Sequence, residues 1–149
     1  MQISSRFTLA IHIFVCIDVF GKERKVTSTF LAESTNVNPV IIRNILLQLK
    51  AAGLVHVARG AGGAVIARPL SEITLLDIYH AVECVGHGTL FHFHENPNAG
   101  CPVGRNIHRI LDDKLERVQK AMERELASIT LEDVRRDTEK YLSYGAVAE

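Results

Sequence analysis

A change of hydrophobic period at Gly53 constrains the fold of this chain more than any other feature. Before Gly53, residues 39–52 carry apolar side chains at helical spacing, which predicts a helix with one buried stripe. The stripe is expected at Ile41, Ile45 and Leu49, flanked by Ile42 and Leu46. After Gly53, residues 54–57 and 64–66 are short β-branched runs around a glycine-rich segment, which is typical of a hairpin. The sequence therefore predicts a helix that leads directly into a β-hairpin.

A tight turn at residues 36–39 precedes that helix. Asn38 can cap the helix, and Pro39 can occupy its first position, where a missing N–H leaves no bond unmade. Helical spacing also predicts a longer helix over residues 4–20 and a short one over residues 27–34. Two short helices joined by a tight turn form a helix-turn-helix, and the hairpin behind them would be its wing. Residues 1–85 are thus expected to form a winged helix-turn-helix domain.

The second half of the chain is predicted to be helical. Thr74 with Asp77 and Thr130 with Asp133 each match a capping box, which predicts helices over residues 74–85 and from 130 to about 141, with a frayed tail at 145–149. A long helix is expected between them, over residues 102–128. The predicted fold class is mainly α with a small β-hairpin: a winged helix-turn-helix domain (1–85), a loop (86–101), and a long dimerisation helix with a C-terminal helix (102–149).

The charge is distributed unevenly along a chain whose formal net charge is zero. Residues 1–70 hold eight Lys/Arg against three Asp/Glu, a balance of +5. Residues 71–149 hold nine against fourteen, a balance of −5. Since a nucleic-acid-binding protein needs only one positive face, this asymmetry places that face in the winged domain.

Several classes of protein do not fit the sequence. No apolar run approaches the ~20 residues that span a bilayer, and the start lacks the layout of a signal peptide. The three cysteines, Cys16, Cys84 and Cys101, are an odd and sparse set that indicates a reducing compartment, so a cytoplasmic protein is expected. No nucleophile motif, phosphate loop or dinucleotide fingerprint is present, and the acidic residues 112, 113 and 116 read as a solvated helix face. An enzyme is not expected.

The chain resembles the Rrf-two family of winged-helix regulators. The resemblance is carried by SRFTLAI (5–11), NVNPVIIR (36–43), LQLKAAGLV (47–55), RGAGG (59–63) and ITLLDIY (73–79). It covers roughly residues 1–130, in the correct order. The resemblance implies a sequence-specific DNA-binding transcriptional regulator, with repression as its expected mode.

The family fold implies a homodimer in which the long helix crosses between subunits, and the apolar seam of residues 102–128 agrees with it. The seam residues expected at the interface are Ile107, Leu111, Leu115, Val118, Met122 and Leu126. The alternative is burial of the seam against the chain's own winged domain. A dimer is favoured because a helix of this length outruns what a domain of ~80 residues can cover.

The helix after the turn would enter the major groove of double-stranded DNA, and a dimer implies a partly palindromic operator. By the resemblance, Asn38, Val40 and Arg43 lie where family members contact bases, and Asn44 shares their face. Arg59 and Gly60 in the wing are expected to approach the backbone or minor groove. Candidates for phosphate contacts are Ser5, Arg6, Thr29 and Lys50. The alternatives are an ordinary helix surface and a winged-helix adaptor that binds protein without touching DNA.

The signal that would control such a regulator has several candidates. Cluster-binding family members carry three closely spaced cysteines in the loop after the fourth helix, whereas this chain has only Cys101 there, which argues against an iron–sulfur cluster. His92, His94 and Cys101 are candidate ligands for a transition metal, although the loop, which also holds His87, equally resembles a solvated one. Cys101 at a helix start is also a candidate redox thiol, with simple packing as the alternative. Cys16 and Cys84 are expected to be core residues, and a small-molecule effector remains open.

Overall fold

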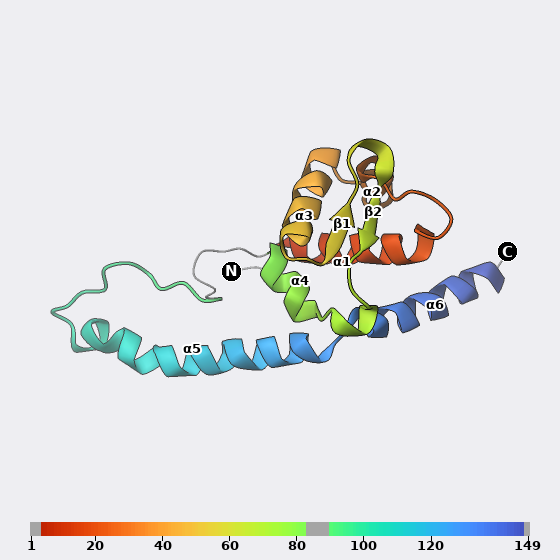
Figure 1. Ribbon diagram of the computed structural model, residues 1–149. Helices are drawn as coiled ribbons and strands as arrows, with labels where there is room; N and C mark the ends of the chain where they lie inside the picture. The colour runs from red at the N-terminus through yellow and green to blue at the C-terminus, as the bar shows by residue number, and fades with distance from the viewer. Residues whose placement is uncertain (1–3, 83–89, 148–149) are drawn as a thin grey trace.

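The computed structural model describes residues 4–82 and 90–147 of the chain. Three helices open it: α1 (Ser5–Phe20), α2 (Ser28–Thr35) and α3 (Pro39–Ala51). A hairpin of β1 (Val55–Val57) and β2 (Ala64–Ile66) follows, and then α4 (Leu75–Val82), α5 (Pro102–Ser128) and α6 (Leu131–Val147). Single 3₁₀ turns, η1 (Gly60–Gly62) and η2 (Leu70–Glu72), lie at the hairpin tip and before α4. In Figure 1 the winged domain sits above a line formed by α5 and α6, and α4 joins the two parts. The predicted fold class is confirmed.

Local side-chain caps start the first three helices. The Ser4 hydroxyl accepts a hydrogen bond from the Arg6 amide at 3.1 Å, and the Thr27 hydroxyl accepts one from the Phe30 amide at 3.2 Å. The Asn38 side-chain oxygen accepts one from the Val40 amide at 2.9 Å. Each cap satisfies a donor that the first helical turn leaves without an intrahelical partner. The predicted cap at Asn38 and Pro39 at the start of α3 are confirmed.

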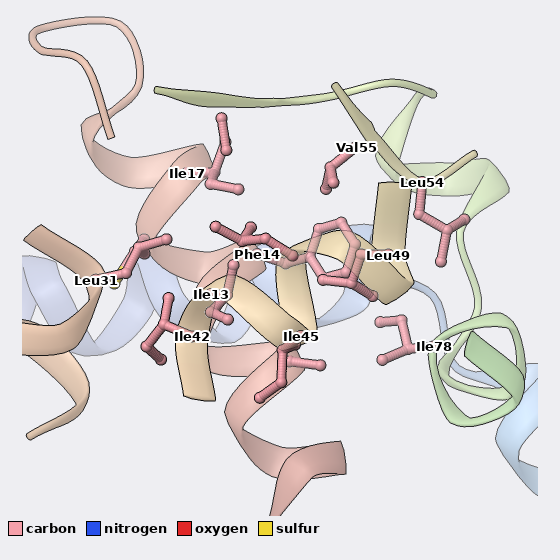
Figure 2. Close-up of a cluster of buried hydrophobic side chains, with 14 of the residues drawn as sticks. Ile13, Phe14, Ile17, Leu31, Ile42, Ile45, Leu49, Leu54, Val55 and Ile78 are labelled. Atoms are coloured by element: carbon pink, nitrogen blue, oxygen red, sulfur yellow. The ribbon is translucent and has the colours of Figure 1, made fainter. Parts of the chain in front are cut away.

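The core of the winged domain is built where α1, α2 and α3 cross behind the hairpin (Figure 2). Its largest fully buried side chains include Ile13, Phe14, Leu31, Ile42, Ile45, Leu49, Leu54 and Ile78. The predicted stripe on α3 was wrong at Ile41, which is 43% exposed, whereas Ile42, Ile45, Leu46 and Leu49 are buried. At 100° per residue the buried arc of α3 is centred between Ile42 and Leu49, so Ile41 lies at its edge.

The wing is a short antiparallel ladder with Val55 opposite Ile66 and Val57 opposite Ala64. The Ala64 amide also donates to the Val26 carbonyl at 2.9 Å, which fastens the hairpin to the segment before α2. Gly63 has φ +80°, and a Cβ there would lie 2.9 Å from the Val26 nitrogen. Only glycine at position 63 therefore lets the wing approach the Val26 backbone this closely.

Two capping boxes meet where α4 and α6 begin. The Thr74 amide donates to the Asp77 carboxylate and the Thr130 amide to the Asp133 carboxylate, both at 2.9 Å. Reciprocal backbone bonds join the two starts: the Leu75 amide donates to the Ile129 carbonyl, and the Leu131 amide to the Ile73 carbonyl, each at 2.9 Å. Both predicted boxes are confirmed, but their pairing is a tertiary feature.

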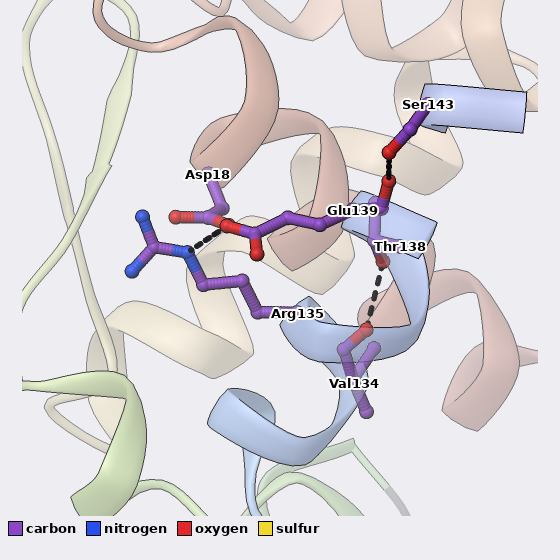
Figure 3. Close-up of polar contacts among 6 residues, drawn as sticks. All are labelled: Asp18, Val134, Arg135, Thr138, Glu139 and Ser143. Atoms are coloured by element: carbon purple, nitrogen blue, oxygen red, sulfur yellow. Dashed lines mark hydrogen bonds and ion pairs between the residues drawn. The ribbon is translucent and has the colours of Figure 1, made fainter. Parts of the chain in front are cut away.

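From this junction α6 packs back on α1. Leu131 is buried in the core, and Arg135 Nε lies 3.5 Å from an Asp18 carboxylate oxygen of α1 and 3.4 Å from one of Glu139 (Figure 3). α6 continues to Val147, beyond the predicted end near residue 141 and into the tail expected to fray. Gly145 is the one glycine in this stretch, and a glycine makes helix formation only about 1 kcal/mol less favourable than an alanine does.

α5 has the predicted bounds and no buried residue. It packs against α4 and against residues 90–100, and elsewhere it extends away from the winged domain (Figure 1). Within one chain the winged domain therefore contacts α5 mainly through α4, and this contact, which was the alternative to a dimer, leaves no residue of α5 fully buried. Val118, in the middle of the seam, is 53% exposed. No helix in the described part of the chain is long and apolar enough to cross a bilayer.

Candidate DNA-binding surface

The outward face of α3 carries four exposed side chains: Val40, Arg43, Asn44 and Leu47. They follow the spacing i, i+3, i+4, i+7, which places them on one side of a helix. The opposite side is held in the core by Ile42, Ile45, Leu46 and Leu49. The core thus fixes which side chains α3 presents.

Asn38 stands at the N-terminal end of this face and already has a structural task. Its side-chain oxygen accepts the Val40 amide, so its side-chain NH₂ is the group left to donate to a ligand. α3 also begins here, and the N-terminus of a helix favours negative charge. The same residue can therefore cap the helix and contact DNA.

The wing stands across a groove from α3. The groove has a volume of about 290 Å³ and is lined by Val26, Thr27, Ser28, Arg43, Leu46, Leu47, Val57, Ala58, Gly60, Gly63 and Ala64. Arg59, at the wing tip, is exposed, and Gly60 has φ +68° with open space where a Cβ would be. The wing tip can therefore approach a polymer backbone without steric hindrance.

Three basic side chains on this side have no ion-pair partner in the part of the chain that the structure describes. None of the ion pairs among the described residues involves Arg43, Lys50 or Arg59. All three side chains are exposed, with Lys50 in the last turn of α3. An unpaired, solvated guanidinium or ammonium can pair with phosphate without first breaking an internal bond.

The remaining phosphate candidates are divided between two places. Thr29 is exposed in the first turn of α2. Ser5 is exposed and Arg6 half-buried at the start of α1, and Arg6 Nη2 donates to the Gln48 side-chain oxygen of α3 at 2.5 Å. Arg6 therefore links α1 to α3 through this hydrogen bond. The sequence around Arg6 gave no sign of this contact.

Two surface residues were missed by the sequence reasoning. Leu47 is 61% exposed on the outward face of α3. No sequence signal predicted this exposure, because an apolar residue in a helix is as easily buried. Lys25 lies beside the wing, since a Cβ on Gly63 would come 3.3 Å from the Lys25 Cβ. The charged run at residues 22–25 was the available signal for Lys25.

The candidate metal ligands are not brought together. Residues 91 and 93 are half-buried and, with Leu115 of α5, line a common groove, while the alternate residues His92 and His94 are exposed. This alternation turns both imidazoles away from α5. Among the described residues, no three His, Cys, Asp or Glu side chains converge on a position that could hold a metal ion. The candidate ligands His92, His94 and Cys101 therefore do not form a metal site in this structure.

Cys101 is exposed and precedes the first turn of α5. The backbone amides of Gly104 and Val103 lower the pKa of its thiol, because they donate hydrogen bonds that favour the thiolate. Cys16 is buried in α1, with its sulfur 3.2 Å from the Ser34 hydroxyl, which confirms it as a core residue. Cys84 and His87 lie outside the described residues.

Known proteins similar to this chain share its architecture. A family model described as "Rrf2: Iron-dependent Transcriptional regulator" matches residues 3–137. YwnA of Bacillus subtilis (strain 168), whose name describes an HTH-type transcriptional regulator, is 42% identical over 133 residues, which are 89% of this chain and 96% of YwnA. A crystal structure described as a DNA-binding protein is 38% identical with a TM-score of 0.70, covering 88% of this chain and 99% of its own. A transcriptional regulator from Lactobacillus plantarum is 25% identical with a TM-score of 0.76, covering 97% and 99%.

Proposed function

This chain belongs to the Rrf2 (Rrf-two) family of transcriptional regulators, and from that premise we propose that it binds double-stranded DNA as a homodimer and represses transcription. The observation that carries the proposal is the outward face of α3, where Val40, Arg43 and Asn44 stand exposed opposite a buried stripe. Residues 1–85 would hold the DNA contacts and residues 102–149 the dimer contacts. Regulation of transcription, not catalysis, is the activity of this family.

The proposed docking places α3 in the major groove, which is wide enough to admit a helix. Arg43 suits bidentate contact with a guanine edge and Asn44 with an adenine edge, while Asn38 would donate at the helix start. Arg59 and Gly60 of the wing would follow the adjacent backbone or minor groove. Ser5, Arg6, Thr29 and Lys50, together with Lys25, would contact phosphates and set the register without reading sequence.

The dimer supplies the second half-site. In one chain no residue of α5 is buried, so its apolar seam stays in contact with water. The same seam of a second copy would pack against it and bury it. A two-fold dimer implies a partly palindromic operator, with half-site centres about 34–36 Å apart or at multiples of that spacing.

The test separates a DNA-binding regulator from a protein-binding adaptor. Binding of the full chain to duplex DNA is measured by fluorescence anisotropy between 50 and 200 mM salt, first with its own upstream DNA and then with a random-sequence duplex. Counterion release predicts affinity that falls steeply with salt, by about 10³-fold or more for six phosphate contacts. A flat salt response, or equal affinity for both duplexes, would overturn the proposal.

Cys101 supports a finer proposal, that an oxidant is the signal. Its exposed thiol has a lowered pKa, and the thiolate is the nucleophilic form. The thiolate sulfur would attack the O–O bond of a peroxide and take up one oxygen as sulfenic acid, while the other oxygen leaves as hydroxide or alkoxide. The change occurs at the start of α5, beside the proposed dimer seam.

The oxidant test compares wild type with Cys101→Ser in gel shifts on the upstream DNA, with and without hydrogen peroxide. Release of the wild-type protein by peroxide, absent in Cys101→Ser, is expected. Equal release of both proteins would assign the effect to another group. No release of either would discard oxidant sensing and leave control by a metal or a small molecule.

A further inference from the structure

Two exposed apolar side chains lie on the outward face of α3. Val40 is 55% exposed and Leu47 is 61% exposed, at the two ends of the face that presents Arg43 and Asn44. Isolated exposed apolar residues are common on protein surfaces. These two, however, lie seven residues apart on the side of the helix that would face DNA.

The major groove offers one apolar group to such side chains. Base edges there present hydrogen-bond donors and acceptors, and only thymine adds a methyl group, at C5. From the exposed side chains and this chemistry, we propose that Val40 and Leu47 each contact a thymine methyl group in the operator. The inference rests on the proposed DNA-binding function and names the bases that the α3 face selects.

The helix geometry sets the spacing of the two thymines. Seven residues at about 1.5 Å per residue separate Val40 from Leu47 by about 10 Å along α3. This distance equals about three base-pair steps of 3.4 Å. Arg43 lies between them, so each half-site would hold two thymines, on either strand, flanking the base pair read by Arg43.

The surroundings of Leu47 make it the more informative of the two. It lines the groove between α3 and the wing together with Leu46 and Val57, so a duplex lying across α3 and the wing would cover it. A sugar of the DNA backbone is the competing contact for a side chain this close to the wing. A sugar contact and a methyl contact differ in one respect, because only the methyl contact depends on the base.

The experiment removes single methyl groups from the DNA. An operator is selected from a random duplex pool by the full-length protein, and each thymine is then replaced in turn by uracil, which pairs identically but lacks the methyl group. At two positions per half-site, about three base pairs apart, the dissociation constant is expected to rise about fourfold, as for one unburied methyl group. Leu47→Ala should abolish the uracil effect at one of them and Val40→Ala at the other.

Controls and contrary outcomes are distinct. Val103→Ala, in an equally exposed valine at the start of α5, should leave every uracil effect unchanged. Uracil substitutions without effect on a tightly bound operator would overturn the inference and leave DNA binding intact. Leu47→Ala that weakens binding while both uracil effects persist would overturn it for Leu47 in favour of the sugar. Failure to select any operator would overturn the proposed function itself.

Discussion

At the scale of single residues, three arginines near the proposed DNA-binding surface differ in their surroundings. Arg43 projects from the α3 face, whereas Arg59 lies on the wing beside Gly60, and neither forms an ion pair among the described residues. Arg6 is different, because its guanidinium is held by Gln48. Of the three arginines, the two unpaired ones are expected to differ in what they contribute to specificity.

Arg59→Ala is expected to weaken binding to all duplex sequences by a similar factor and to reduce the salt slope by about 1, because it removes a phosphate contact. Arg43→Ala should instead relax preference at one base pair per half-site, at a cost of about 1–3 kcal/mol for the preferred sequence. Anisotropy titrations against the operator and single-base variants measure both. Unchanged affinity in Arg59→Ala would contradict the wing assignment.

Asp133 gives a residue-scale dependence on pH. Its pKa is lowered mainly because the Thr130 amide and hydroxyl donate to the carboxylate, with Arg136 adding a smaller charge effect. A lowered folded-state pKa stabilises the fold at pH values above the unfolded pKa of about 4, and this stability is lost as pH falls through the folded value.

Below pH 4, the urea concentration at the midpoint of unfolding is expected to fall more steeply in wild type than in Asp133→Asn. The variant has no carboxylate at this position to protonate. Urea titrations at pH 7, 4 and 3 measure it. Parallel curves for the two proteins would show that this carboxylate does not contribute to acid sensitivity.

At the scale of elements, the junction of α4 and α6 joins the winged domain to the helices that follow. Each helix starts with its own capping box, and the reciprocal bonds of Leu75 with Ile129 and Leu131 with Ile73 place the two starts side by side. The junction therefore combines a local signal with a long-range pairing.

Thr130→Val is expected to lower the free energy of unfolding by about 1 kcal/mol, because it removes the hydroxyl that caps α6. Thr138→Val is the matched control, since the Thr138 hydroxyl donates only to the Val134 carbonyl one turn earlier in the same helix, at 2.9 Å (Figure 3). That bond should contribute little. Equal losses in the two variants, measured by urea unfolding, would contradict a capping role for Thr130.

At the scale of the whole molecule, a long helix without a buried side chain is the feature that demands a partner. α5 extends from the winged domain (Figure 1), and none of its residues is fully buried within one chain. A single chain leaves this apolar surface in water, and a second copy of the same seam would bury it.

Val118→Asp is expected to dissociate the dimer, since it places a charge in the middle of the seam without a buried partner. Arg109→Asp is the control and should remain dimeric, because Arg109 is exposed and lies about 180° around α5 from Val118. Sedimentation velocity distinguishes the two states, and operator affinity should fall only in Val118→Asp. A Val118→Asp protein that sediments like wild type would place the interface elsewhere.

The sequence alone determined the features that depend on neighbours a few residues away. The caps at Asn38, Thr74 and Thr130 and the bounds of α5 were predictable because a cap or a helical period is formed within one or two turns. The fold class followed from the order of these local signals. The candidate base-contacting residues of α3 were named from the resemblance to the Rrf2 family, with helical period placing Asn44 on the same face.

Only the tertiary structure decided contacts between residues far apart in the chain. Local period could not distinguish Ile41, exposed at the edge of the buried arc, from its buried neighbour Ile42. It could not pair Arg6 with Gln48, 42 positions away, or place the start of α4 against that of α6. Nor could it show that His92 and His94 are both exposed and do not converge with Cys101 on a metal position. Which face of an element meets another depends on the whole core, because many distant side chains must fill one space together.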